Sequence, residues 1–120
     1  MSLLAVFILV ALGTAADGPA PARSIDGGRN WIYTSDYPAD ALRERRGGVV
    51  TVQLEVSRRG TVDGCTIARS SGHRDLDQIS CMAMAMRGRY EPARNADGQR
   101  IASTVMRQIV WDPRTVAAAN

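Results

Sequence analysis

Residues 49–57 constrain the fold of this chain more than any other segment does. Their side chains alternate strictly between apolar and polar. The apolar set is Val50, Val52, Leu54 and Val56, and the polar set is Thr51, Gln53, Glu55 and Ser57. Because successive side chains of a β-strand point to opposite faces, this alternation predicts a strand with one buried face and one solvated face.

A second strand follows through a tight turn. Arg58, Arg59 and Gly60 form this turn, where glycine can adopt the positive φ that hairpin turns often require. Residues 61–69 have the apolar positions of a second strand, and their Asp63-Gly64 step indicates a β-bulge that shifts the alternation. The two segments together predict an antiparallel hairpin.

Two helices and a last strand complete the pattern. Pro38 suits the first turn of a helix, where its missing N–H costs nothing, so residues 39–46 are predicted to be helical up to a pair of glycines. A second helix is predicted over residues 75–86, and residues 100–111 have the β-branched and apolar composition of a long strand. The order helix, strand, strand, helix, strand predicts an α+β fold, a three-stranded antiparallel sheet packed with two helices.

The buried face of the second helix is ambiguous in the sequence. One stripe at helical spacing consists of Leu76, Ile79, Ala83 and Met86, and another consists of Leu76, Ser80, Cys81 and Met84. The first stripe is more apolar, but it would turn Cys81 away from the sheet. The second stripe must face the sheet at least in part if Cys81 forms a disulfide with Cys65.

The first sixteen residues have the features of an export signal. Residues 3–12 form a ten-residue apolar run, which is shorter than the roughly 20 residues that a membrane-spanning helix needs. Small residues follow up to Ala16 and suit a cleavage site, although no Lys or Arg precedes the run. Residues 1–16 are therefore predicted to be a signal peptide, with a short uncleaved anchor as the alternative, and residues 17–34 a flexible linker.

The two cysteines agree with export. Cys65 and Cys81 are the only cysteines and His73 is the only histidine, so a zinc site with about four ligands is not expected. In an oxidising compartment the two cysteines are predicted to form a disulfide, which would contribute about 3 kcal/mol by closing the loop. Two buried free thiols in a cytosolic protein are the alternative.

No arrangement of residues indicates an enzyme, a cofactor or a metal site. His73 lies next to Ser70 and Ser71 in a loop, without the third group that orients a catalytic base. Asp75 and Asp77 are two positions apart, so they diverge on a helix and make a poor acid–base pair. No phosphate-binding loop is present, and we predict no catalytic residues.

The positive charge does not indicate a nucleic-acid partner. The net charge is +3 and all basic residues are arginines, but they are scattered, without a basic stripe of interleaved aromatic residues. A basic domain that binds an envelope polymer remains a second hypothesis, which a steep salt dependence would reveal.

The last strand is predicted to be an edge open to a partner. Residues 100–111 contain no proline, and Arg100 and Arg107 are their only charges, so the strand has little protection against pairing. An extended peptide or a second copy of the chain could add to such an edge. The alternative is that the linker or residues 115–120 cover the strand.

The motifs and their order resemble the TonB C-terminal domain family over residues 37–111. The residues that carry the resemblance are Tyr37-Pro38-Ala39, Gly48-Val49-Val50-Thr51-Val52, Gly60-Thr61-Val62, Arg69-Ser70-Ser71-Gly72, Leu76-Asp77 and Arg89-Tyr90-Glu91-Pro92-Ala93. The two cysteines resemble a subset of this family in which the second strand and the second helix each carry one. The resemblance places a TonB-like domain at residues 35–112 and a tail at residues 113–120.

The resemblance implies a periplasmic module whose last strand pairs with a peptide of an outer-membrane receptor, in support of transmembrane transport. The implied contact positions are Tyr37, Pro38, Ala102, Thr104, Met106, Gln108 and Val110. A full energy transducer of this family has a spanning helix with a motor-contacting histidine and a long proline-rich reach, and neither pattern occurs here. The alternative is therefore a stand-alone envelope adaptor without energy transduction.

Overall fold

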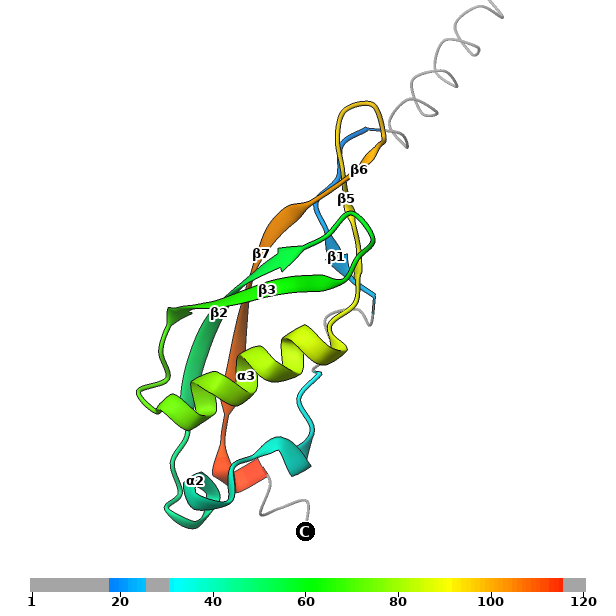
Figure 1. Ribbon diagram of the computed structural model, residues 1–120. Helices are drawn as coiled ribbons and strands as arrows, with labels where there is room; N and C mark the ends of the chain where they lie inside the picture. Colours follow the sequence, from blue (N-terminus) through cyan, green and yellow to red (C-terminus); the bar gives the residue numbers. More distant parts are fainter. Residues whose placement is uncertain (1–17, 26–30, 116–120) are drawn as a thin grey trace, which may run out of the picture.

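A computed structural model describes residues 18–25 and 31–115 (Figure 1). Its elements are β1 (Arg23–Ser24), the 3₁₀-helix η1 (Thr34–Asp36), α2 (Ala39–Arg43), β2 (Gly48–Val56), β3 (Val62–Arg69), α3 (Arg74–Arg87), β4 (Tyr90–Glu91), β5 (Ala93–Arg94), β6 (Arg100–Ile101) and β7 (Ser103–Trp111). The main sheet has three antiparallel strands in the order β3-β2-β7. This arrangement confirms the predicted α+β class.

β2 is the central strand because both of its edges are paired. Its pairing with β7 is regular from Gly48 opposite Trp111 to Val56 opposite Ser103. Its pairing with β3 shifts twice, and the shift between Glu55 and Val56 falls where the Asp63-Gly64 step indicated a bulge. The second shift, between Thr51 and Val52, was not predicted.

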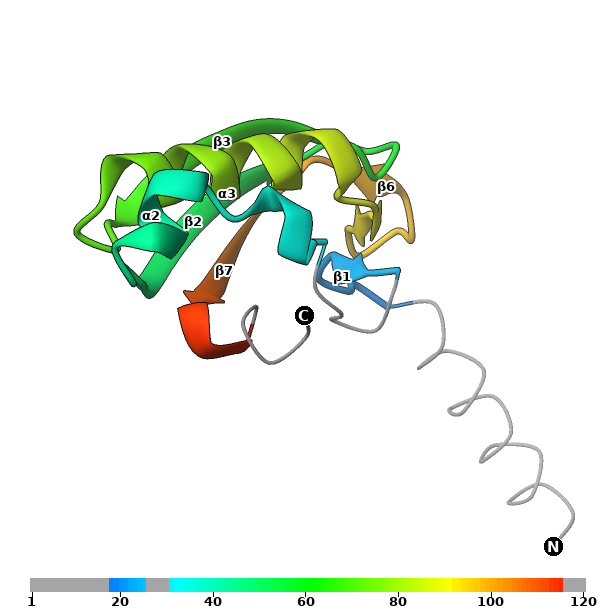
Figure 2. The same cartoon turned by 90° about the horizontal axis from the view of Figure 1, so that it is seen from below.

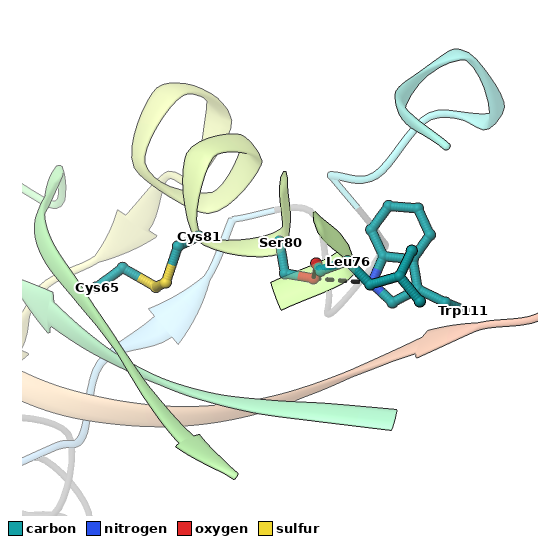
Figure 3. Close-up of a disulfide and its surroundings, with 5 residues drawn as sticks. All are labelled: Cys65, Leu76, Ser80, Cys81 and Trp111. Carbon is teal, nitrogen blue, oxygen red and sulfur yellow. Dashed lines mark hydrogen bonds between the residues drawn. A yellow bond between two sulfur atoms is a disulfide. The ribbon is translucent and has the colours of Figure 1, made fainter. Parts of the chain in front are cut away.

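α3 covers β2 and β3 on one face of the sheet, and Figure 2 shows this layer from below. The helix buries Leu76, Ser80, Ala83 and Met84, whereas Met86 is 62% exposed. The sheet therefore receives Ser80 and Met84 of the less apolar stripe together with Ala83 of the other stripe. Ser80 is tolerated there because its hydroxyl donates to the Leu76 carbonyl oxygen at 2.7 Å and accepts from Trp111 Nε1 at 2.8 Å (Figure 3).

A disulfide joins the sheet to the helix. Cys65 on β3 and Cys81 on α3 are bonded, with their Cα atoms 5.5 Å apart (Figure 3). The predicted pairing is thus present in the structure. Because it closes a loop that contains the β3–α3 connection, it restricts the unfolded chain and fixes the rotation of α3.

The hydrophobic core lies between the helices and the sheet. Its buried members are Tyr37, Ala41, Val50, Val52, Leu54, Val56, Val62, Leu76, Met84, Tyr90, Ile109 and Trp111. The partly buried residues packed against it begin at Ala22. In the described part of the chain, the core therefore uses no residue before Ala22.

Part of the predicted flexible linker is structured. β1 pairs with β4, and Ala20 exchanges two backbone hydrogen bonds with Arg94, at 3.1 and 2.8 Å. These pairings use backbone groups, so they leave no hydrophobic periodicity by which the sequence could have revealed them.

The predicted signal peptide or anchor lies outside the described residues. Among the described helices, none has the length and apolar character required to span a membrane.

Candidate functional site

β7 has one neighbour in the main sheet and so presents an edge. Within residues 18–25 and 31–115, β2 is the only strand that pairs with β7. The alternative that the linker or the tail covers this edge by strand pairing is not seen in that part of the chain. Among the described strands the second edge of β7 is therefore unpaired, and its backbone groups could pair with another strand.

The register shows which residues of β7 direct their backbone groups to this edge. The Ser57 N–H donates to the Thr61 carbonyl oxygen at 2.9 Å, so Ser57 faces β3. The N–H and C=O groups of successive residues in a strand point to alternate sides. The odd-numbered residues of β2 therefore direct these groups to β3, and the even-numbered ones, such as Val52, direct them to β7. Their partners on β7, such as Arg107 opposite Val52, face back toward β2.

The remaining residues of β7 direct their N–H and C=O groups to the open edge. They are Thr104, Met106, Gln108 and Val110. These four are among the positions that the family resemblance implied. Ala102, the fifth strand position implied, is exposed and lies between β6 and β7.

The side chains of these four residues lie on the outer face of the sheet, away from α3. Met106 and Val110 are 55% and 65% exposed, and the Thr104 hydroxyl donates to Glu55 at 3.2 Å. None of the four carries a charge. An incoming strand would therefore meet apolar and neutral side chains on this face.

The inner face of β7 contacts the segment that enters the domain. The Arg107 guanidinium lies 4.6 Å from the centre of the Trp31 ring, and Trp31 makes an edge contact with Tyr90 at 5.5 Å. Trp31 falls within the predicted linker, and nothing in the local sequence indicates this contact with residues far along the chain.

An ion pair fixes the entering segment to the end of α3. Arg87 donates to both carboxylate oxygens of Asp36, at 2.6 and 3.0 Å, and to the Trp31 carbonyl oxygen at 2.9 Å. The same guanidinium lies 4.2 Å from the centre of the Tyr33 ring. The hydrogen bonds from Arg87 outweigh burial and lower the pKa of Asp36. Sequence reasoning missed this cluster because its members lie far apart in the chain.

Tyr37, an implied contact residue, is buried. Its hydroxyl donates to the Arg46 carbonyl oxygen, and its ring packs edge-on against Trp111 at 5.1 Å. Its ring therefore supports the end of β7 from inside the core. Pro38 is half-buried at the start of α2. Tyr37 lines a small pocket together with residues 32–34, residues 110–112 and Thr115.

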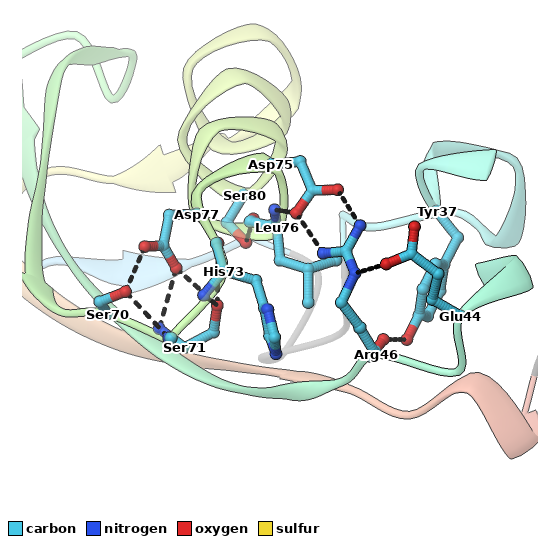
Figure 4. A network of polar contacts seen from close by, with 11 residues as sticks. Tyr37, Glu44, Arg46, Ser70, Ser71, His73, Asp75, Leu76, Asp77 and Ser80 are labelled. Carbon is cyan, nitrogen blue, oxygen red and sulfur yellow. Dashed lines mark hydrogen bonds and ion pairs between the residues drawn. The ribbon is translucent and has the colours of Figure 1, made fainter. Parts of the chain in front are cut away.

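Asp77 organises the loop before α3. Its carboxylate accepts hydrogen bonds from the Ser70 hydroxyl at 2.5 Å, the Ser71 N–H at 2.9 Å and the Ser71 hydroxyl at 2.8 Å (Figure 4). Burial alone would raise the pKa of Asp77, but these hydrogen bonds lower it overall. The carboxylate is thus held as a structural acceptor.

Asp75 has a separate partner. Arg46 donates to both of its oxygens at 2.9 Å and so connects α3 to the segment after α2 (Figure 4). Asp75 and Asp77 therefore serve different contacts and form no acid–base pair. Across residues 18–25 and 31–115, no three His, Cys, Asp or Glu side chains are grouped so that they could hold a metal ion.

The fold and the open edge define a class of small α+β domains built on a three-stranded antiparallel sheet in which β7 is one of the two edge strands. The chain belongs to the family described as the Gram-negative bacterial TonB protein C-terminal, whose model matches residues 34–113. The solution NMR structure of the Pseudomonas aeruginosa TonB CTD has a similar fold, with a TM-score of 0.56 and 20% identity over 78% of this chain and 87% of that one. A comparison with curated proteins finds no match.

Proposed function

We propose that this chain is a periplasmic, TonB-like protein-binding module. Its strand β7 would pair with an extended peptide of an outer-membrane receptor and so support transport across that membrane. The observation that carries the proposal is the open edge formed by Thr104, Met106, Gln108 and Val110. In this mode of recognition the backbone supplies affinity, and alternate side chains supply specificity.

Two further observations support the proposal. The family match extends over residues 34–113 and so includes the whole of β7. The Cys65–Cys81 disulfide is the kind of bond that persists in an oxidising compartment such as the periplasm.

A stand-alone adaptor is the second candidate, and the N-terminal pairing favours it. Because Ala20 is hydrogen-bonded to Arg94, residues 13–19 separate the apolar run from this pairing. If that run stays in a membrane, the eight residues from its end to Ala20 span at most about 28 Å. Such a short connection favours a module that acts close to its membrane over one that reaches a distant receptor.

The test is a titration of the isotope-labelled domain with peptides from the N-termini of outer-membrane receptors. We expect the largest NMR shifts in β7 and in residues 31–37. Gln108→Pro removes an N–H at the open edge and should weaken binding at least about tenfold, since a strand proline cannot donate to the ladder.

Gln108→Ala is the matched control, because it also removes the side chain but keeps the N–H, so it should bind more tightly than Gln108→Pro does. Val105→Pro is unsuitable as a test. The Val105 N–H points to β2, so proline there would disrupt the sheet itself. Shifts confined to other surfaces, or equal binding by the proline and alanine variants at position 108, would contradict strand pairing at this edge.

A further inference from the structure

Four exposed arginines gather at the end of the molecule opposite α2. They are Arg23 on β1, Arg58 and Arg59 in the β2–β3 turn, and Arg100 on β6, and we refer to them as the basic end. The elements that carry them meet around β4 and β5 (Figure 1). The Tyr90 N–H donates to the Gly60 carbonyl oxygen at 2.8 Å, β1 pairs with β4, and β5 pairs with β6.

The charge of the basic end is not neutralised within the described residues. None of its four arginines is in an ion pair there, and Glu91, the nearest acid by strand pairing, lies 3.6 Å from Arg94 instead. At the opposite end, Arg45, Arg69 and Arg74 are also exposed without an ion pair among the described residues, but the other arginines have acidic partners. These pairs are Arg43 with Asp40, Arg46 with Glu44 and Asp75, and Arg114 with Asp112. Ion pairs therefore neutralise part of the positive charge at the opposite end, whereas they neutralise none of the four arginines of the basic end.

The chain also enters the folded domain at this end. Ala20 is hydrogen-bonded to Arg94, whose strand partner across the β5–β6 hairpin is Arg100. The apolar run of residues 3–12 precedes Ala20 by only eight residues, which span at most about 28 Å. Any membrane that holds this run would lie within that distance of the basic end.

We propose that the basic end binds the surface of a membrane containing anionic phospholipids. Juxtamembrane arginines are attracted to such a surface by the negative potential of its headgroups, and each one contributes to the attraction. The proposal does not depend on peptide pairing by β7. β7 runs from Ser103, near the basic end, toward Trp111 opposite Gly48, so its open edge extends away from the membrane-facing end.

The test uses a chain of residues 17–120, which contains the whole described core and lacks the apolar run. It is sedimented with phosphatidylcholine vesicles that contain or lack about 30 mol% phosphatidylglycerol, at low and at high salt. We expect binding only to the anionic vesicles, and release at high salt. Replacing both Arg58 and Arg59 with Glu should weaken binding at least about 25-fold, from about fivefold for each arginine.

The matched control replaces Arg43 and Arg114 with Glu, which changes the net charge equally at the opposite end. It should bind the vesicles within about threefold of the unaltered chain. Circular dichroism establishes that both variants are folded. No binding to anionic vesicles, equal binding to neutral ones, or equal losses in the two variants would overturn the proposal. So would tighter binding to a single-stranded oligonucleotide than to the vesicles.

Discussion

Asp77 illustrates how one side chain positions a whole element. Its carboxylate holds both serines of the loop that leads into α3, the helix that carries half of the disulfide. The sequence alone does not indicate this role, because acidic residues near a helix N-terminus also occur on solvated surfaces, where the helix dipole favours them. The contact requires the loop to fold back over the first turn of the helix.

We expect Asp77→Asn to destabilise the domain by about 1–3 kcal/mol, because an amide cannot accept all three hydrogen bonds and leaves buried groups unsatisfied. Urea denaturation measures the change. Asp97→Asn is the control, since Asp97 is exposed in the β5–β6 turn, and it should alter the free energy of unfolding by less than about 0.5 kcal/mol. Equal effects of the two substitutions would contradict the structural role of Asp77.

The Asp36–Arg87 pair predicts a loss of stability in acid. The pKa of Asp36 is lowered in the folded state, mainly by hydrogen bonds from Arg87. A group with a lowered folded pKa contributes stability above its unfolded pKa of about 4 and loses that contribution as the pH falls through the folded value. Thermal unfolding between about pH 7 and pH 3 should therefore show a steeper fall for the unaltered domain than for Asp36→Asn. Parallel curves would refute this linkage.

The β2–β3 turn depends on glycine at the scale of the element. Gly60 has a φ of +89°, and a Cβ built there would lie 2.0 Å from the Tyr90 carbonyl oxygen. Gly72 has a similar φ of +93°, but nothing lies within 4 Å of its Cβ position. Alanine substitutions at the two glycines therefore distinguish two contributions to the free energy of unfolding, the backbone conformation alone at Gly72 and the added steric overlap at Gly60.

We expect Gly72→Ala to lower the free energy of unfolding by about 1–2 kcal/mol, the cost of a left-handed conformation for an L-residue. Gly60→Ala should cost about 1–3 kcal/mol more, because the hairpin must also move away from β4. Chemical denaturation of both variants measures the difference. Similar losses would mean that the contact between Gly60 and Tyr90 has no energetic importance.

The sequence could predict some elements and not others. The alternation in β2 predicted a strand because burial acts on every second side chain. The buried face of α3 could not be chosen, because it is decided by contacts of Ser80 and Cys81 with distant residues. The two-residue strands β1, β4, β5 and β6 are too short to leave a periodic pattern.

The candidate site was also predictable only in part. The family resemblance implied the open-edge positions of β7, and their role as contact residues stays a prediction. The Trp31 contact with Arg107 and the Asp36–Arg87 pair were missed, because both depend on how the entering segment crosses the domain.

For the whole molecule, export remains a prediction. Residues 1–16 have the apolar run and small residues of a signal peptide, and we expect the mature chain to begin at Asp17. The intact mass of the protein from the cell envelope checks this. Gly18 and the residues after it should stay on the mature chain, because Ala20 pairs with Arg94. A full-length chain recovered from the cytosol would contradict the prediction.

The central position of β2 has a consequence for how the chain reaches its folded state. One neighbour, β3, follows immediately after a short turn, whereas the other, β7, is the last strand of the chain. Closing the longer loop costs more entropy, so the hairpin should form early and β7 should join late. Until then β2 has an unpaired edge of its own, so the risk of aggregation is greatest in the interval before the C-terminal strand is in place.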